Sequence, residues 1–119
     1  MNKRYLIILL GLFFLVGCSG GNSSLINYVQ AKEQIINHGA LLLDVRTQEE
    51  YDNDHIDGAI LFTLDTITDS TASEVISSKD TPVIVYCQSG NRSHQALEKL
   101  QDLGYKNVYD LGSISNWKE

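Results

Sequence analysis

The chain has 119 residues, which is enough for one domain and little more. Its nine Lys and Arg residues face fifteen Asp and Glu residues, which gives a net charge of −6 at pH 7. An acidic chain is a poor partner for nucleic acid or for an anionic lipid surface, so binding of DNA or RNA is not expected.

The first seventeen residues have the three parts of an export signal. Lys3 and Arg4 form a basic start, and residues 5–16 form an almost unbroken apolar run. This run is too short to cross a bilayer core of about 30 Å as a helix, so it is interpreted as the hydrophobic region of a signal peptide. The run closes on Leu-Val-Gly-Cys, which resembles the lipobox of bacterial lipoproteins. That resemblance implies that Cys18 is lipidated and begins the mature chain; an ordinary signal peptide with a coincidental cysteine is the alternative.

The predicted mature chain is more acidic than the precursor. Loss of residues 1–17 leaves seven basic residues against fifteen acidic ones, a net charge of −8. Residues 18–25 are expected to be the lipidated cysteine and a flexible tether, because the Ser, Gly and Asn side chains there have nothing to bury. The folded domain is then residues 26–119. We expect it outside the cytoplasm, on the periplasmic face or the cell surface, with the lipid as its only attachment to the membrane.

Apolar runs and turn residues predict strands that alternate with short helices. In chain order, the expected elements are a helix at 29–38, a buried strand at 40–45, a helix that Thr47 and Glu50 begin as a capping box, a short strand at 59–62, a helix near 73–78, a strand from Val83, a helix at 93–103, a strand at 107–109, a turn at 111–113 and a final segment carrying Trp117. This alternation predicts a small, mainly parallel α/β sheet with helices on both faces. Ligands of such sheets gather at the carboxyl ends of the strands.

Cys87 stands at such a place, at the end of the strand that starts after Pro82. A tight strand-loop-helix connection directs backbone N–H groups and a helix N-terminus at one point, where a thiolate is favoured over a thiol. With Cys18 assigned to a lipid, Cys87 has no partner cysteine in the chain. A leftover cysteine in an exported protein indicates a reactive thiol or an intermolecular disulfide, and a small buried hydrophobe is the structural alternative. No His and Cys spacing predicts a metal site, and no cofactor is expected.

Three segments of the chain resemble the single-domain rhodaneses, a sulfurtransferase family. They are residues 42–51 with their Asp-Val-Arg element, residues 55–60 with His-Ile-Asp-Gly-Ala-Ile, and the loop at 85–93. The similarity covers about residues 26–117 and implies the three-layer rhodanese-like fold. The chain departs from the family at Asp54 and Asp57, where Gly and Pro are usual, and at Ser113, where a second Gly often precedes the tryptophan segment.

The resemblance also implies a reaction and its residues. Cys87 would take sulfane sulfur from thiosulfate, a persulfide or a polysulfide, hold it as a persulfide, and pass it to a thiol or a cyanide-like acceptor. Asp44 and Arg46 would support the site by an ion pair or by bonds to the backbone that fix the neighbouring loops. The groups expected to bind substrate are Gln88, Ser89, Gly90, Asn91, Arg92 and Ser93, with Arg92 on an anionic donor.

Other functions compete with sulfur transfer. A non-enzymatic module that binds or senses persulfides at the membrane is the first alternative, although such a module needs no nucleophile. Thiol redox chemistry, in which Cys87 forms mixed disulfides, is the second alternative. It is disfavoured because the chain offers no resolving cysteine. Four residues separate Cys87 from Arg92, whereas the related phosphatases have five, so phosphatase activity is disfavoured. The acidic surface further predicts weak affinity for thiosulfate.

Overall fold

The computed structural model describes residues 24–118 of the chain. The predicted signal peptide and Cys18 lie outside these residues. Between Ser24 and Lys118, no helix combines the length and the apolar character that a membrane span requires.

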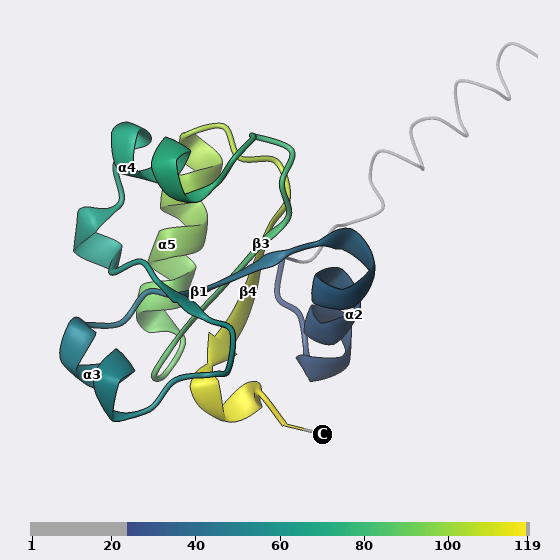
Figure 1. Ribbon diagram of the computed structural model, residues 1–119, viewed down its shortest axis with the longest axis vertical. Helices are drawn as coiled ribbons and strands as arrows, with labels where there is room; N and C mark the ends of the chain where they lie inside the picture. The colour runs from purple at the N-terminus through teal and green to yellow at the C-terminus, as the bar shows by residue number, and fades with distance from the viewer. Residues whose placement is uncertain (1–23, 119) are drawn as a thin grey trace, which may run out of the picture.

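A single four-stranded sheet forms the centre of the domain (Figure 1). The strands are β1 (Leu41–Asp44), β2 (Ile60–Leu61), β3 (Val83–Cys87) and β4 (Val108–Ser113). Their order is β2-β1-β3-β4, and every neighbouring pair is parallel. The helices are α2 (Tyr28–His38), α3 (Gln48–Asn53), α4 (Asp69–Val75) and α5 (Asn91–Asp102), with short 3₁₀ turns η1 (Leu64–Thr66) and η2 (Ile114–Asn116). The predicted parallel α/β sheet is confirmed.

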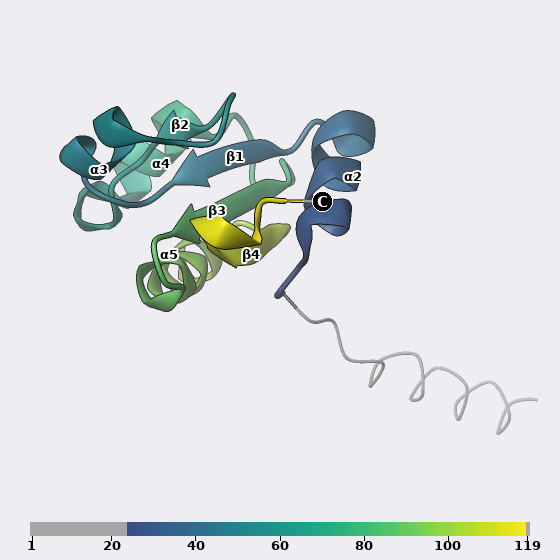
Figure 2. The same ribbon diagram turned by 90° about the horizontal axis from the view of Figure 1, so that it is seen from below.

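Helices cover both faces of the sheet, as predicted (Figure 2). One apolar cluster joins the sheet to α4 and α5, and the other joins it to α2 and the C-terminal segment around Trp117. Strand β3 contributes residues to both clusters, because successive side chains of a strand point to opposite faces of the sheet. Val85 and Cys87 belong to the first cluster, whereas Ile84 and Tyr86 belong to the second. All five residues of β3 are buried, which is typical of a central parallel strand.

The capping box that starts α3 is also confirmed. The Thr47 side chain accepts a hydrogen bond from the Glu50 N–H, and the Glu50 carboxylate accepts one from the Thr47 N–H at 3.1 Å. Both bonds satisfy N–H groups that the first turn of a helix leaves without partners. This cap places Glu50 in the first turn of α3, six residues after the end of β1.

Two predicted helix positions are wrong. Helix α4 covers Asp69–Val75 and not residues 73–78, because Thr68 and Thr71 form a capping box that sets its start four residues earlier than Ser73. Helix α5 begins at Asn91 and not at Ser93. Gly90 precedes it with φ +103°, a conformation that only glycine adopts readily, so the chain turns from loop to helix within one residue.

Strand β4 is longer than predicted. The segment 111–113, expected to be a turn, continues the strand and pairs with the end of β3. The register slips there, since Val85 lies opposite Asp110 whereas Tyr86 lies opposite Gly112. Gly112 has φ +81°, which permits this bulge. The extra pairing carries Ser113 to a position beside Cys87.

The start of the described chain joins the edge of the sheet. Leu25, at the end of the predicted tether, forms a parallel bridge with Asp110 of β4. The Asp110 N–H donates to the Ser24 carbonyl oxygen at 2.7 Å, and the Ile26 N–H donates to the Asp110 carbonyl oxygen at 3.0 Å. Backbone pairing therefore begins two residues before the predicted domain boundary at residue 26.

Candidate active site

Cys87 is the last residue of β3, and its side chain faces the loop that leads into α5. The residue is fully buried, with a free thiol. The Gly90 N–H donates a hydrogen bond to Cys87 Sγ at 3.0 Å, so the loop turns back over the sulfur. A buried structural cysteine would be surrounded by apolar groups, whereas this sulfur faces hydrogen-bond donors at the N-terminus of a helix.

The environment of Cys87 lowers the pKa of its thiol. Burial is the strongest single influence and by itself would raise this pKa. The Ser93 hydroxyl, which in the structure donates to the Gly90 carbonyl oxygen at 3.1 Å, opposes this effect together with the backbone N–H groups of Ser93, Gly90 and Ser89, because donors close to the sulfur stabilise the thiolate. Together these donors outweigh burial, and the pKa lies below its ordinary value. The sulfur is therefore better prepared to act as a nucleophile and as a leaving group than a free cysteine.

Strand β4 holds the loop in place. The Ser113 hydroxyl donates to the Gln88 carbonyl oxygen at 2.7 Å, and a Cβ on Gly90 would stand 3.8 Å from the Cα of Gly112. The sequence marks Ser113 only as a departure from the family pattern and not as a site residue, because only the longer β4 and its bulge bring it to the loop. A Ser at a strand end carries no signal of such a role in the sequence itself.

Asp44 and Arg46 form the expected ion pair at the carboxyl end of β1. Arg46 Nη2 lies 2.8 Å from Asp44 Oδ2, and both side chains are almost completely buried. The bond to Asp44 raises the pKa of Arg46 further above its usual range. The Tyr86 hydroxyl donates to Asp44 Oδ2 at 2.7 Å, and Arg46 Nη1 donates to Gln88 Oε1 at 3.2 Å. The pair thus connects β1, β3 and the first residue of the loop.

Arg92 is already occupied by a carboxylate. It lies in the first turn of α5 and donates from Nη1 to Glu50 Oε1 at 2.7 Å and from Nη2 to Glu50 Oε2 at 2.9 Å. Hydrogen bonding to Arg92 lowers the pKa of Glu50 to about 2, so the carboxylate is ionised at neutral pH. The sequence analysis assigns Glu50 to helix capping alone. Its second role depends on a contact between residues 42 positions apart.

The remaining predicted site residues surround the sulfur on its open side. Gln88, Ser89 and Asn91 are exposed, whereas Ser93 is fully buried beneath the loop. The Asn91 side chain accepts a hydrogen bond from Gln95 Nε2 at 3.2 Å. The structure therefore brings Asp44, Arg46 and residues 87–93 to one end of the sheet, with Asp44, Arg46, Cys87 and Ser93 buried and the remaining side chains at the rim.

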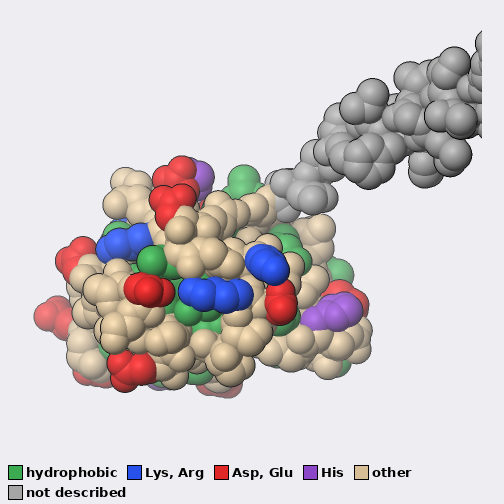
Figure 3. All heavy atoms as spheres, turned by 90° about the horizontal axis from the view of Figure 1, so that it is seen from above, with side chains coloured by type: hydrophobic (Ala, Val, Ile, Leu, Met, Phe, Trp, Pro, Cys, Tyr) green, Lys and Arg blue, Asp and Glu red, His purple; other side chains and the backbone are tan. Residues whose placement is uncertain are grey.

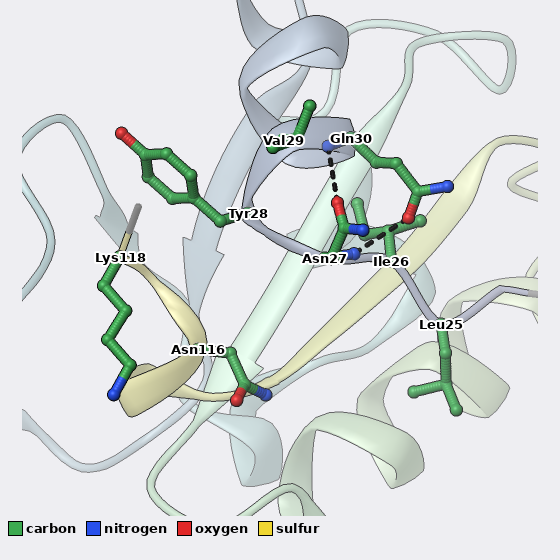
Figure 4. A pocket seen from close by; sticks show the side chains of 8 residues that line it. All are labelled: Leu25, Ile26, Asn27, Tyr28, Val29, Gln30, Asn116 and Lys118. Carbon is green, nitrogen blue, oxygen red and sulfur yellow. Dashed lines mark hydrogen bonds between the residues drawn. The ribbon is translucent and has the colours of Figure 1, made fainter.

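A separate groove of about 700 Å³ lies on the opposite side of the sheet from α5 (Figure 4). It is lined by residues 25–30, at the start of α2, and by Asn116 and Lys118 of the C-terminal segment. Asn27, which caps α2, accepts a hydrogen bond from the Gln30 N–H at its edge. None of the predicted site residues line this groove.

Comparison with known proteins agrees with this geometry. The model of the rhodanese-like domain family matches residues 15–119. The thiosulfate sulfurtransferase PspE of Escherichia coli (strain K12) is 38% identical over 74 residues, which are 62% of this chain and 70% of that protein. The thiosulfate sulfurtransferase GlpE of Coxiella burnetii is 30% identical over 94 residues, which are 78% of this chain and 85% of that protein.

Solved structures show the same fold. A rhodanese with anions from E. coli superposes with a TM-score of 0.59 at 35% identity, over 65% of this chain and 89% of that one. The human single-domain sulfurtransferase TSTD1 superposes with a TM-score of 0.66 at 20% identity, over 81% of this chain and 96% of that one. With its buried cysteine held by loop amides at the end of a parallel strand, the chain belongs to the rhodanese-like domain family and is a rhodanese-type sulfurtransferase.

Proposed function

We propose that Cys87 carries sulfane sulfur between a small donor and a thiophilic acceptor. The Cys87 thiolate attacks the outer sulfur of thiosulfate or of a persulfide, and the donor's S–S bond breaks. Sulfite or a thiolate leaves with the electron pair, and Cys87 becomes a persulfide. A thiolate or cyanide then attacks the outer sulfur, the bond to Sγ breaks, and the Cys87 thiolate returns unchanged.

The hydrogen bonds on Cys87 Sγ are the observation that supports this cycle. The same donors serve both halves, since they favour the attacking thiolate in the first step and the leaving thiolate in the second. Donors already aimed at the sulfur need no reorganisation when negative charge moves to the outer atom of a persulfide.

Mass spectrometry of the purified protein tests the proposal. After incubation with thiosulfate or with a low-molecular-weight persulfide, the peptide containing Cys87 should gain the mass of one sulfur atom. Cyanide should then remove that sulfur and release thiocyanate, whereas Cys87→Ser should neither gain sulfur nor form thiocyanate. An adduct that no acceptor discharges would indicate a binding or sensing module, and no adduct with any sulfane donor would refute the transfer cycle.

We also propose that the protein is held on the outer side of a bacterial membrane by a lipid on Cys18. The lipobox-like sequence supports this, and so does the surface next to it. Three of the four large hydrophobic side chains that are exposed among residues 24–118 lie near the start of the domain, namely Leu25, Val29 and Ile36. A chain from Cys18 to Ser24 spans at most about 20 Å, so this apolar side would remain close to the lipid.

Metabolic labelling with palmitate tests the anchor. The wild-type protein should incorporate label and lose its signal peptide, whereas Cys18→Ala should incorporate no label and keep its signal peptide. Cleavage of the wild type at another position, or cleavage without incorporation of label, would contradict the proposed anchor.

A further inference from the structure

The pairing of Arg92 with Glu50 bears on which donor the site accepts. Both Nη groups of Arg92 are used by the two carboxylate oxygens, in the fork geometry that a guanidinium also offers to an oxyanion. The two side chains are about one-third exposed, so the pair lies at the rim of the site and is open to solvent. An anionic donor that approaches Arg92 therefore meets a guanidinium whose charge is already paired with a carboxylate on both Nη groups.

The Glu50 carboxylate is also held by Thr47, the N-cap of its own helix. Its Oε1 accepts hydrogen bonds from the Thr47 N–H at 3.1 Å and from the Thr47 hydroxyl at 3.0 Å. Displacing the carboxylate from Arg92 would leave it near the guanidinium, because the capping box holds it in the first turn of α3. A donor anion and Glu50 would then compete for one cation within a few ångströms of each other.

The other charges near Cys87 do not compensate for Glu50. Arg46 is buried and paired with Asp44. When Cys87 is ionised, the three negative groups Cys87, Asp44 and Glu50 outnumber the two guanidinium groups.

On the wider surface, too, most basic side chains are paired with acidic ones. Four of the seven Lys and Arg side chains of residues 24–118 form ion pairs, and the face in Figure 3 shows basic side chains interspersed with acidic ones.

We propose that Glu50 is a specificity-determining residue that disfavours doubly charged donors. The physiological donor is then a sulfane sulfur compound that brings at most one negative charge to the site, such as a persulfide, and thiosulfate is a poor substrate. This inference rests on the proposed transfer cycle and adds the charge class of the donor. Glu50 acts through Arg92 and is a positioning residue, since it makes no contact with the reacting sulfur.

Two donors that differ by one charge test this directly. Thiosulfate is a dianion, and in methanethiosulfonate a methyl group replaces one of its charged oxygens, so that the outer sulfur is kept with a single negative charge. Thiocyanate formation with cyanide as acceptor is measured for both donors. The variants are Glu50→Gln and, as control, Glu49→Gln, which removes the same charge from an exposed neighbour in the same helical turn. Glutamine also serves in capping boxes, so Glu50→Gln keeps the start of α3.

Glu50→Gln should raise kcat/KM for thiosulfate about tenfold, since each of its two charges contributes about threefold at a distance of about 6 Å and an effective dielectric constant of about 80. The gain should appear in KM, with kcat changed less than about twofold, because Cys87 and its amides are unaffected. The gain for methanethiosulfonate should be distinctly smaller, and Glu49→Gln should change neither donor appreciably.

Three results would overturn the assignment of Glu50. Equal effects of the two substitutions would show that only the long-range charge of the surface matters. Equal gains for both donors would show that Glu50 does not discriminate between donors by their charge. An unchanged KM for thiosulfate in Glu50→Gln would show that the pair of Arg92 and Glu50 does not weaken thiosulfate binding. Failure of the transfer cycle looks different, because then neither donor yields thiocyanate with the wild-type protein.

Discussion

Replacing Asp44 by Asn should destabilise the domain more than any other conservative single change near the site. The Asp44 carboxylate is completely buried and accepts hydrogen bonds from the backbone N–H, Nε and Nη2 of Arg46 and from the Tyr86 hydroxyl. Asparagine removes the charge and one acceptor oxygen, yet the buried guanidinium of Arg46 remains. Its amide group would also direct N–H donors at the donors of Arg46 and Tyr86.

The expected cost follows from the charge that stays behind. Removing one partner of a buried ion pair costs about 3–5 kcal/mol, because the other charge is left without compensation in a medium of low polarity. Small domains have a total free energy of unfolding of about 5–15 kcal/mol, so the loss is a large fraction of it. For a domain of this size, such a loss lowers Tm by at least about 12 °C.

Urea unfolding followed by Trp117 fluorescence and by far-ultraviolet circular dichroism measures this cost. Asp57→Asn is the matched control, because Asp57 is exposed and its replacement should change the free energy of unfolding by less than about 0.5 kcal/mol. The double variant Asp44→Leu with Arg46→Met should be more stable than Asp44→Asn, since it leaves no buried charge. A loss below about 1 kcal/mol in Asp44→Asn would refute the view that Asp44 compensates a buried guanidinium.

Three further changes test the site and its supports. Ser93→Ala removes a donor beside the thiolate and should raise the pKa of Cys87. At pH values well below the pKa of Cys87, the rate of sulfur loading should fall about tenfold, whereas above this pKa it should change little. An unchanged pH profile of the loading rate would contradict the role of the hydroxyl. Gly90→Ala meets only ordinary contacts but keeps φ near +103°, and should cost about 1–3 kcal/mol in urea unfolding, whereas a neutral result would show that the loop relaxes freely. The buried Ile56 N–H donates to the Tyr86 hydroxyl at 3.2 Å, and Tyr86→Phe leaves this N–H without an acceptor. The free energy of unfolding in urea should fall by about 1–3 kcal/mol. An unchanged free energy of unfolding would indicate that another acceptor replaces the hydroxyl.

Signals between near neighbours were sufficient for much of the fold. The apolar run before Cys87 predicted a central strand, because only a strand covered on both faces tolerates side chains that are apolar on both sides. Thr47 and Glu50 predicted the start of α3, since the capping box depends on residues three positions apart. The prediction at 73–78 failed because the capping box of α4 has Thr71 in place of the usual Glu or Gln, which makes a weaker local signal. The prediction at 111–113 failed because the extension of β4 depends on a partner strand far away in the sequence.

By itself, the sequence determined that a cysteine stands at the end of a buried parallel strand, with a helix N-terminus close behind it. Only the tertiary structure decided the charge that a donor meets there. Glu50 follows β1 and Arg92 follows β3, and these strands are neighbours in the sheet, so their carboxyl ends bring the two side chains together across 42 positions of sequence. Neither residue signals the other locally, because a contact between strands is set by their pairing and not by spacing along the chain.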